Sequence, residues 1–358
     1  RSASDGGLHM VRVGIVGAGF MGNTHAQCYQ LIPKATLVGV ADPVAKSRKQ
    51  FAAQYGCEAY DTLEDMLAAD VDAVDICTPT FLHAEQTVAA ARAGKHIVCE
   101  KPMALTLREC DRMIAAARKA RVVFMVAQVL RFWPEYVYIA DLVRSGKLGR
   151  VHWAEANRLA PAPGWSWDDW IRDAERSGGP ILDLHIHDLD FLAWLLGPPK
   201  RVFCSGIEGK GSHRSKLLTT VFTCLEGHRR GARSLATAST GMKGDFPFTM
   251  GLLISAEKGT IAFDATRDPA LTVMEEGKKP KHPKVPQPKV PKSAYGRGNI
   301  EALGGYYVEL KYFVDCIEKG EKPTTVTPQD ARLAVELCLA ARKSAQTGKA
   351  MRVASTVG

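Results

Sequence analysis

Residues 11–22 read VRVGIVGAGFMG, and this stretch decides the fold. Val11–Val16 is apolar enough to form a buried strand, and it runs directly into the pattern G-x-G-x-x-G at residues 17–22. A helical stretch from Asn23 to about Leu31 follows. Glycines at this point allow a tight turn and let a phosphate group approach the amide groups at the start of the helix. The stretch predicts a strand, a phosphate-binding turn and a helix, with a glycine-rich turn that binds nothing as the alternative.

A dinucleotide is the ligand that this turn favours. The residues that we expect to contact it here are Gly17, Gly19, Phe20, Met21 and Gly22. A second strand, Thr36–Ala41, ends in Asp42, 20 residues after Gly22. A carboxylate at this position accepts hydrogen bonds from the adenine ribose hydroxyls and repels a 2′-phosphate. NAD is therefore predicted rather than NADP, although Lys46 and Arg48 lie within reach.

Strands and helices then alternate as far as residue 128. The further strands are expected at 71–77, 96–99 and 122–127, and the helices at 62–69, 84–93 and 106–120. This alternation predicts an α/β fold, with a doubly wound parallel sheet of the Rossmann type over residues 11–128. Ligands bind at the carboxyl ends of such strands. The cofactor-site residues expected at these ends are Thr78, Pro79, Glu100, Lys101 and Gln128. Lys101 can polarise a substrate hydroxyl, unless it is an ordinary surface lysine.

The chain after Gln128 has a different pattern. Runs of strand-like sequence follow one another between residues 202 and 275 with short turns and no helices, which indicates a mainly antiparallel sheet. Helices are expected at 134–145 and 328–346. We therefore expect a second, α+β domain over residues 129–358, which binds the substrate and carries the contacts of an oligomer.

The segment Pro180–Leu196 is predicted to be one buried helix, because it is apolar nearly all round. Asp183, His187 and Asp190 fall on one face of it. An aspartate one turn from a histidine supplies an orienting carboxylate and a base that titrates near neutrality. A core histidine satisfied by Asp183 is the alternative. A metal site is disfavoured, because helical residues two apart, such as His185 and His187, point about 200° from each other.

Five motifs occur together in a familiar order. They are Gly-Ala-Gly-Phe-Met-Gly with His25, Cys-Thr-Pro-Thr with His83, Glu100-Lys101-Pro102, Arg131-Phe132 before Pro134, and Gly178-Gly179 before Asp183-x-x-x-His187-x-x-Asp190. In this the chain resembles the glucose–fructose oxidoreductase/inositol dehydrogenase (Gfo/Idh/MocA) family from Val11 to about Val353. The resemblance implies that Lys101, Asp183 and His187 form the catalytic group and that His83 belongs to the cofactor site. Pro180 and His185 depart from the family pattern, and both could reshape the substrate pocket.

The resemblance also implies an activity. It is that of an NAD(P)-dependent dehydrogenase acting on CH–OH groups, specifically on a secondary alcohol of a sugar, polyol or sugar derivative. A redox-neutral glycosidase that uses NAD and a non-catalytic NAD-binding regulator remain as alternatives. The expected substrate contacts are Arg131, Asn157, Trp165, Trp170 and Asp190. Tryptophans so close together can form a sugar-binding wall, although ordinary packing explains them equally well.

The composition limits the partners. The net charge of +9 is local, because residues 278–292 contain six lysines and no acidic residue, and without them it is +3 (9 − 6). Such a Lys/Pro-rich segment is typical of an extended, solvated loop. With no aromatic basic platform, we predict no nucleic-acid partner. No apolar run reaches the length of a membrane span, so no membrane partner is expected either.

Nine cysteines without a disulfide pattern indicate the cytoplasm. Residues 1–10 are expected to be an expression remnant or a disordered arm.

Two structural details are also predicted. The strands after Val202 leave an apolar sheet face with few helices to cover it, which is typical of an interface. Since relatives use this sheet to assemble, a homodimer or homotetramer is expected. In the E-K-P motif of relatives the lysine–proline bond is often cis, so a cis Lys101–Pro102 bond is predicted.

Overall fold

The computed structural model describes residues 10–164, 166–211, 216–289 and 303–354. The first domain contains a six-stranded parallel sheet in the order β3-β2-β1-β4-β5-β6. Its strands are β1 (Val11–Val16), β2 (Ala35–Ala41), β3 (Glu58–Tyr60), β4 (Ala73–Ile76), β5 (His96–Glu100) and β6 (Phe124–Ala127). Its helices are α1 (Phe20–Tyr29), α2 (Ala45–Tyr55), α3 (Leu63–Ala68), α4 (His83–Arg92) and α5 (Leu107–Ala120). The predicted doubly wound sheet is confirmed.

The second domain contains an eight-stranded sheet in the order β13-β12-β11-β7-β10-β9-β8-β14. Its strands are β7 (Val151–Pro161), β8 (Arg201–Lys210), β9 (Lys216–Glu226), β10 (Arg233–Met242), β11 (Thr249–Ala256), β12 (Gly259–Asp264), β13 (Leu271–Glu275) and β14 (Met351–Arg352). Only β7 and β10 pair in parallel, and the other described neighbours are antiparallel. The expected mainly antiparallel sheet is therefore confirmed.

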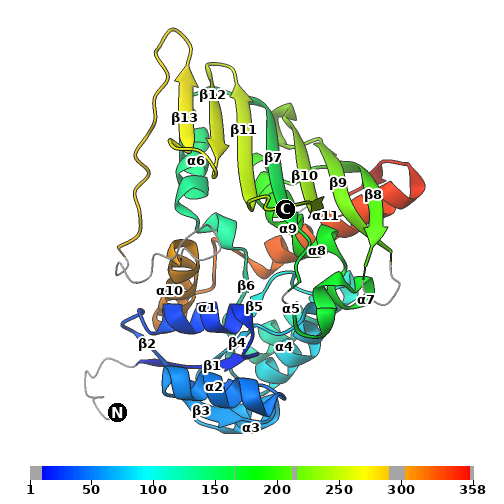
Figure 1. Ribbon diagram of the computed structural model, residues 1–358. Coiled ribbons are helices and arrows are strands. Elements are labelled where there is room, and N and C mark those ends of the chain that lie inside the picture. Colours follow the sequence, from blue (N-terminus) through cyan, green and yellow to red (C-terminus); the bar gives the residue numbers. More distant parts are fainter. Residues whose placement is uncertain (1–9, 165, 212–215, 290–302, 355–358) are drawn as a thin grey trace.

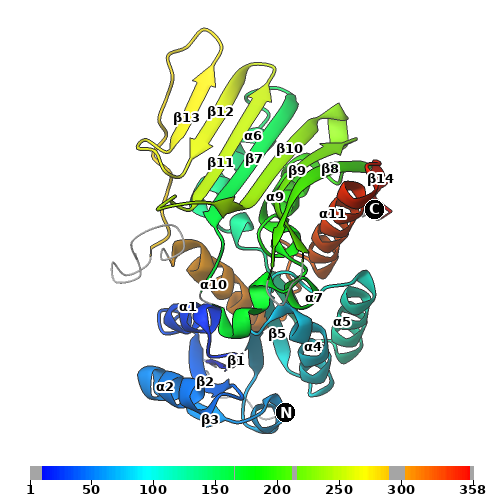
Figure 2. The ribbon, with the colours of Figure 1, turned by 45° about the vertical axis from the view of Figure 1, so that its right-hand side comes forward.

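Helices cover one face of this second sheet. In both ribbon views α6 (Pro134–Arg144), α9 (Ile186–Leu196) and α11 (Pro328–Thr347) lie on the same side of it (Figures 1 and 2). Alternate residues of the strands, such as Ala154 and Ala156 of β7, are buried against these helices. No helix in the described part of the chain is long and apolar enough to cross a bilayer.

The helix predicted over residues 180–196 is interrupted. It consists of α8 (Pro180–Asp183) and α9, and a turn at Leu184 and His185 separates them. The break turns His185 into the second-domain core, where its Nε2 lies 2.8 Å from Thr223 Oγ1. His187 faces the cavity described below. The side chains of His185 and His187 therefore point in different directions, as the sequence predicts. The cause is the break between α8 and α9, and not the periodicity of one continuous helix.

The prediction missed α10 (Gly304–Lys319), which packs beside α1 (Figure 2). This helix comes late in the chain, yet it belongs to the core of the first domain. Its residues Leu310, Phe313 and Val314 are fully buried in one cluster with Val13 and Ile15 of β1. The first domain is thus completed by a segment from beyond the second sheet.

The described part of the Lys/Pro-rich segment, residues 278–289, contains no helix or strand and runs from β13 towards α10 (Figure 1). The extended form predicted for it is confirmed there. Val273 of the edge strand β13 exchanges backbone hydrogen bonds with Lys281, at 2.8 and 2.9 Å. The segment therefore covers part of a sheet edge that would otherwise present free backbone groups.

Candidate active site

The glycine-rich turn forms a cradle at the start of α1. Gly17 has φ +102°, and a side chain on Gly22 would meet the Gly17 carbonyl oxygen at 2.0 Å. A side chain on Gly19 would point into open space, with nothing within 4 Å. Gly19 is the N-cap residue of α1, and no side chain caps the helix there. The amide groups at this helix start can therefore face a bound pyrophosphate, so the chain fits an NAD cofactor.

Asp42 lies beside this turn at the end of β2. Its Oδ2 accepts a hydrogen bond from Ala18 N at 2.9 Å and its Oδ1 accepts one from Val44 N at 2.8 Å. These contacts fix the carboxylate beside the turn, as ribose recognition requires. Arg48, a cation close to Asp42, forms an ion pair with Asp61 and donates to the carbonyls of Asp42 and Pro43. Arg48 is therefore already engaged with oxygen atoms of the protein.

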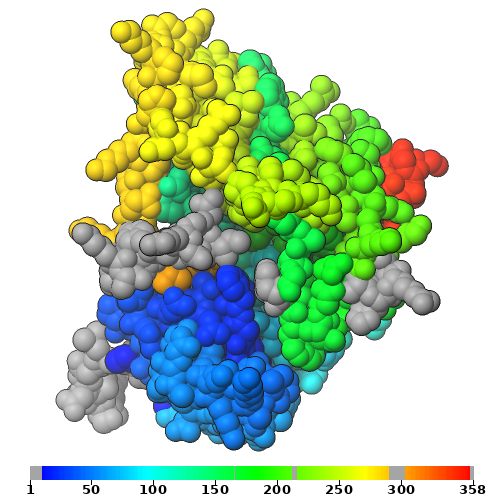
Figure 3. All heavy atoms as spheres, in the orientation of Figure 1, coloured from blue at the N-terminus to red at the C-terminus, as the bar shows by residue number. Residues whose placement is uncertain are grey.

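A cavity of about 1290 Å³ extends from this turn to the second sheet. It lies where the two lobes of the molecule meet, the blue first domain and the green to yellow second domain of Figure 3. Many of the expected site residues line it. From the nucleotide turn and the strand ends these are Gly17, Gly19, Phe20, Met21, Asp42, Thr78, Pro79, Glu100 and Lys101, and from the second domain Trp170, Asp183 and His187.

Lys101 joins the two domains at the wall of this cavity. Its Nζ donates to the backbone carbonyl of Asp183 at 2.7 Å and to Asp183 Oδ1 at 3.0 Å. The side chains of Lys101 and Asp183 are only 16% and 24% exposed. The bond between Lys101 and Pro102 is cis, which confirms the prediction.

His187 lies next to this pair but is not bonded to it. Its side chain hydrogen-bonds no other described residue, and Nδ1 is buried without a partner. Burial, followed by the positive charges of Lys101 and Arg158, lowers the pKa of His187 well below its usual value. The expected contact in which Asp183 orients His187 is absent from the described residues, because the Asp183 carboxylate is turned to Lys101. His187 is thus an uncharged imidazole at the wall of the cavity.

The structure does not bring Arg131 and Asp190 to the cavity. Arg131 Nη2 and Nε lie 2.6 and 2.8 Å from the two Asp190 oxygens, and both side chains are at most 3% exposed. The Asp330 carboxylate is 3.2 Å from Arg131 Nη1 on the other side. Neither residue lines the cavity, and the two form a buried ion pair behind it.

Five further expected residues lie behind the cavity walls, on the other face of the second sheet or outside the described residues. His83 is buried between the carbonyls of Thr78 and Pro102, at 2.8 and 2.9 Å, so it supports the strand ends from behind. Gln128 is also buried, and its Nε2 has no partner among the described residues. Gly22 holds the turn without lining the cavity. Asn157 points to the opposite face of the second sheet, and Trp165 lies outside the described residues.

Arg158 is a charged cavity residue that the sequence analysis missed. Its Nε and Nη2 donate to the two Asp188 oxygens at 3.1 and 2.9 Å, and its guanidinium lies 5.8 Å from the centre of the Phe248 ring. Strand alternation would have revealed it, because Arg158 shares a face of β7 with the buried Ala154 and Ala156. Its neighbour Asn157, which we expected in the site, therefore points away.

Comparison with known proteins agrees with this geometry. Residues 11–128 match the family model described as "Oxidoreductase family, NAD-binding Rossmann fold", and residues 136–262 match the GFO/IDH/MocA C-terminal domain. Myo-inositol 2-dehydrogenase of Thermotoga maritima is 28% identical over 353 residues, which cover 97% of this chain and 100% of that protein. Inositol 2-dehydrogenase of Rhizobium meliloti is 37% identical over 190 residues, 52% of this chain and 55% of that protein. A levoglucosan dehydrogenase in complex with NADH and levoglucosan has the same fold, with a TM-score of 0.84 at 23% identity, over 96% of this chain and 100% of that one.

The nucleotide turn, the acidic residue after β2 and the cavity between the domains thus define an NAD-dependent oxidoreductase. Within this class, the chain belongs to the Gfo/Idh/MocA family, through both of its domains.

Proposed function

We propose that the protein oxidises a secondary alcohol of a sugar, polyol or sugar derivative with NAD⁺, through Lys101, Asp183 and His187. The observation that carries this proposal is the meeting of these three side chains at one cavity that also contains the nucleotide turn. The sugar and polyol dehydrogenases among the relatives support the substrate class. The enzyme is accordingly a dehydrogenase of CH–OH groups.

The turn residues 17–22 and Asp42 would hold NAD⁺, which when bound accepts the hydride from the alcohol carbon. Lys101 donates a hydrogen bond to the reacting oxygen and stabilises the negative charge that develops on it. Asp183 holds the lysine in place through its backbone oxygen and its carboxylate. His187 accepts the hydroxyl proton, and its lowered pKa keeps the imidazole uncharged and able to accept at neutral pH.

The walls around these three residues suit a sugar ring. Trp133, Trp170, Phe248 and Tyr306 line this end of the cavity, and aromatic faces pack against the C–H faces of sugar rings. Arg158 adds a buried cation with hydrogen-bond donors on the same side. The apolar face of a sugar ring could pack against the aromatic side chains, and its hydroxyl groups could accept hydrogen bonds from Arg158.

The experiment is a substrate panel with parallel readouts. The protein is mixed with NAD⁺ and with inositols, hexoses, anhydro sugars and nitrophenyl glycosides, and NADH absorbance and nitrophenol release are followed together. NADH formation with at least one sugar or polyol is the expected result. Nitrophenol release without net NADH would identify a glycosidase. NAD⁺ binding without either signal would favour a regulator.

We also propose that the protein is a homodimer or homotetramer that assembles through the uncovered face of the second sheet. Strand register places five exposed apolar side chains on this face: Trp153, Phe203, Ile207, Phe222 and Leu235. Each is 38–57% exposed, although large apolar side chains are normally buried. A second copy of the same face would cover them. The cytoplasm is proposed as the compartment, since all nine cysteines are free thiols.

A further inference from the structure

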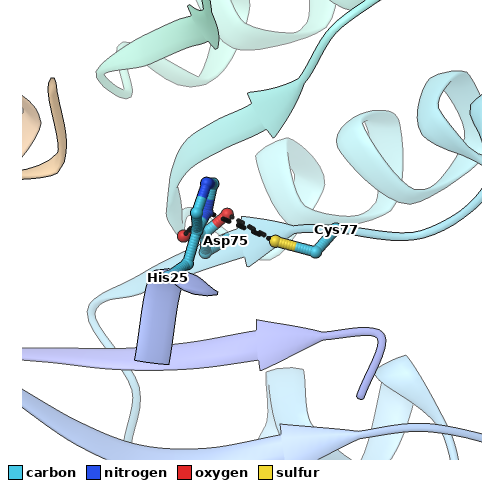
Figure 4. A group of neighbouring side chains, drawn as sticks. All are labelled: His25, Asp75 and Cys77. Carbon is cyan, nitrogen blue, oxygen red and sulfur yellow. Dashed lines mark hydrogen bonds and ion pairs between the residues drawn. The ribbon is translucent and has the colours of Figure 1, made fainter. Parts of the chain in front are cut away.

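A network of charged side chains is buried directly behind the cavity, and the mechanism above does not use it. His25 comes from α1, Asp75 from β4 and Cys77 from just after β4, and the three point toward one another (Figure 4). Glu100, at the end of β5, closes the network on the side of the cavity. His25 and Asp75 are fully buried. Buried charges of this kind cost several kcal/mol unless they are paired.

Both ring nitrogens of His25 face carboxylates. Nδ1 lies 2.8 Å from Asp75 Oδ2, and Nε2 lies 3.2 Å from Glu100 Oε1. Nδ1 is hydrogen-bonded to Asp75, whereas Nε2 and Glu100 are at ion-pair distance without hydrogen-bond geometry. Burial lowers the pKa of His25, but the neighbouring Asp75 carboxylate raises it, and the net shift is to well above the usual value. His25 is therefore an imidazolium between two carboxylates.

The other groups around the imidazolium are uncharged. Tyr29 donates to Asp75 Oδ2 at 2.9 Å, and the Cys77 thiol donates to Asp75 Oδ1 at 3.3 Å. From α10, the Tyr306 ring lies 6.1 Å from the His25 ring. Burial, and next the charge of Glu100, raises the pKa of Glu309 well above its usual value, so this carboxyl group is protonated. Asp75 and Glu100 are thus the two acidic residues whose oxygens lie next to the ring nitrogens of His25.

Glu100 connects this network to the proposed catalytic lysine. While Oε1 faces His25, Oε2 accepts a hydrogen bond from the backbone N of Lys101 at 2.9 Å. The next link is the Lys101 side chain itself, which reaches Asp183 across the cavity wall. His25 does not line the cavity, whereas Glu100 and Lys101 do. A single carboxylate therefore ties a buried imidazolium to the main chain of Lys101.

We propose that His25 is a positioning residue, whose imidazolium fixes Glu100 and through it the placement of Lys101 against the reacting oxygen. This inference rests on the proposed function, because it assumes that Lys101 is catalytic. A displacement of about 1 Å at a catalytic group can reduce the rate by up to about 100-fold. The loss of His25 should therefore lower kcat. Substrate KM and NAD⁺ affinity should change little, because His25 touches neither ligand.

The test is a double-mutant cycle of His25→Gln, Glu100→Gln and the double variant, measured as kcat, KM and the Kd of NAD⁺. Each single change should lower kcat by about 10- to 100-fold. The double variant should be no slower than the slower single one, because both changes break one contact. Tyr29→Phe is the matched control, since it removes a hydroxyl from the same network at the far side of Asp75. It should lower Tm and leave kcat near that of the wild type.

Nitrogen-15 NMR of the wild type, with histidine labelled and His25 assigned from the spectrum of His25→Gln, gives a readout that does not depend on activity. Two protonated ring nitrogens at neutral pH are expected, and a neutral tautomer would overturn the inference. So would multiplicative rate losses in the double variant, an unchanged kcat in His25→Gln, or an equal rate loss in Tyr29→Phe. A wild type that oxidises no sugar, or a Lys101→Met variant with full activity, would instead remove the proposed function itself.

Discussion

The ammonium group of Lys101 reaches two atoms of Asp183, the backbone oxygen at 2.7 Å and Oδ1 at 3.0 Å. The two residues are 82 positions apart in the chain and come from different domains. The backbone oxygen is available because α8 ends at Asp183. The break in the predicted helix therefore supplies one of the two acceptors that hold the lysine. A continuous helix would have used that carbonyl internally.

Lys101→Met should lower kcat by roughly 10²–10³-fold, the usual effect of removing one donor to a developing oxyanion. The Kd of NAD⁺ should stay close to the wild-type value, since the nucleotide turn is untouched. Steady-state kinetics and NAD⁺ titration measure both quantities. Lys119→Met, at an exposed position of α5, is the control and should behave as wild type. Full activity of Lys101→Met would remove the lysine from the mechanism.

His187→Ala should lower kcat by roughly 10²–10⁴-fold, because the proton acceptor is lost.

The wild type should also keep its activity in mild acid. Since the pKa of His187 is lowered, the imidazole stays uncharged as the pH falls through the ordinary value of about 6.5, and it is protonated only below that. The acid limb of the kcat/KM profile that belongs to His187 is therefore expected below pH ~6.5. An acid limb at or above the ordinary histidine pKa that vanishes in the variant would contradict this.

Asp42→Ser combined with Pro43→Arg should shift the preference from NAD⁺ toward NADP⁺. The repulsive carboxylate is removed and a partner for the phosphate is introduced. The Kd values of both cofactors give the answer without any substrate. Asp61→Asn is a useful companion, because it releases Arg48 from its ion pair and should improve NADP⁺ binding on its own. Equal use of both cofactors by the wild type would show that Asp42 does not discriminate between them.

Asp190→Ala should destabilise the fold by about 3–5 kcal/mol, because it leaves the buried Arg131 charge without its main partner. The free energy of unfolding from denaturant titration measures the effect. Asp141→Ala, at an exposed position of α6, is the control and should change stability by less than about 0.5 kcal/mol. A stable Asp190→Ala variant with a raised substrate KM would show instead that Asp190 contributes to substrate binding.

Ile207→Asp and Leu235→Asp together should dissociate the proposed oligomer, since both side chains lie on the uncovered face of the second sheet. Light scattering at micromolar concentration should show an oligomer for the wild type and a monomer for the variant. Lys119→Asp, on the outer side of the first domain, changes charge without touching this face and serves as the control. A monomeric wild type would refute the assembly.

Local pattern was sufficient to predict five of the six strands of the first sheet, the nucleotide turn and the mainly antiparallel second sheet, but not β3 or α2. It failed where distant segments decide the outcome. Gly304 and Gly305 begin α10, and only the packing of Leu310 and Phe313 against β1 makes this segment a core helix. A mid-chain helix break cannot be read from an apolar run either, so one continuous helix was the simplest expectation for residues 180–196.

The candidate site shows the same limit. The cavity brings several of the expected residues together, but their pairing differs from the expectation, because pairing depends on which carboxylate lies nearest after folding. Asp183 pairs with Lys101 rather than His187, and Asp190 pairs with Arg131. One error could have been avoided, the choice of Asn157 instead of Arg158 as a site residue. Extending the alternation of the buried Ala154 and Ala156 along β7 places Arg158 on the same face.

The position of α10 has a consequence for biosynthesis. The first sheet is complete in sequence by Ala127, but one of its faces is closed by Leu310, Phe313 and Val314. While the ribosome is still translating the second sheet, that face of the nascent first domain has no cover from α10. The domain encoded first can therefore finish folding only when nearly the whole chain has emerged, and a chaperone that shields apolar surface would act during that interval.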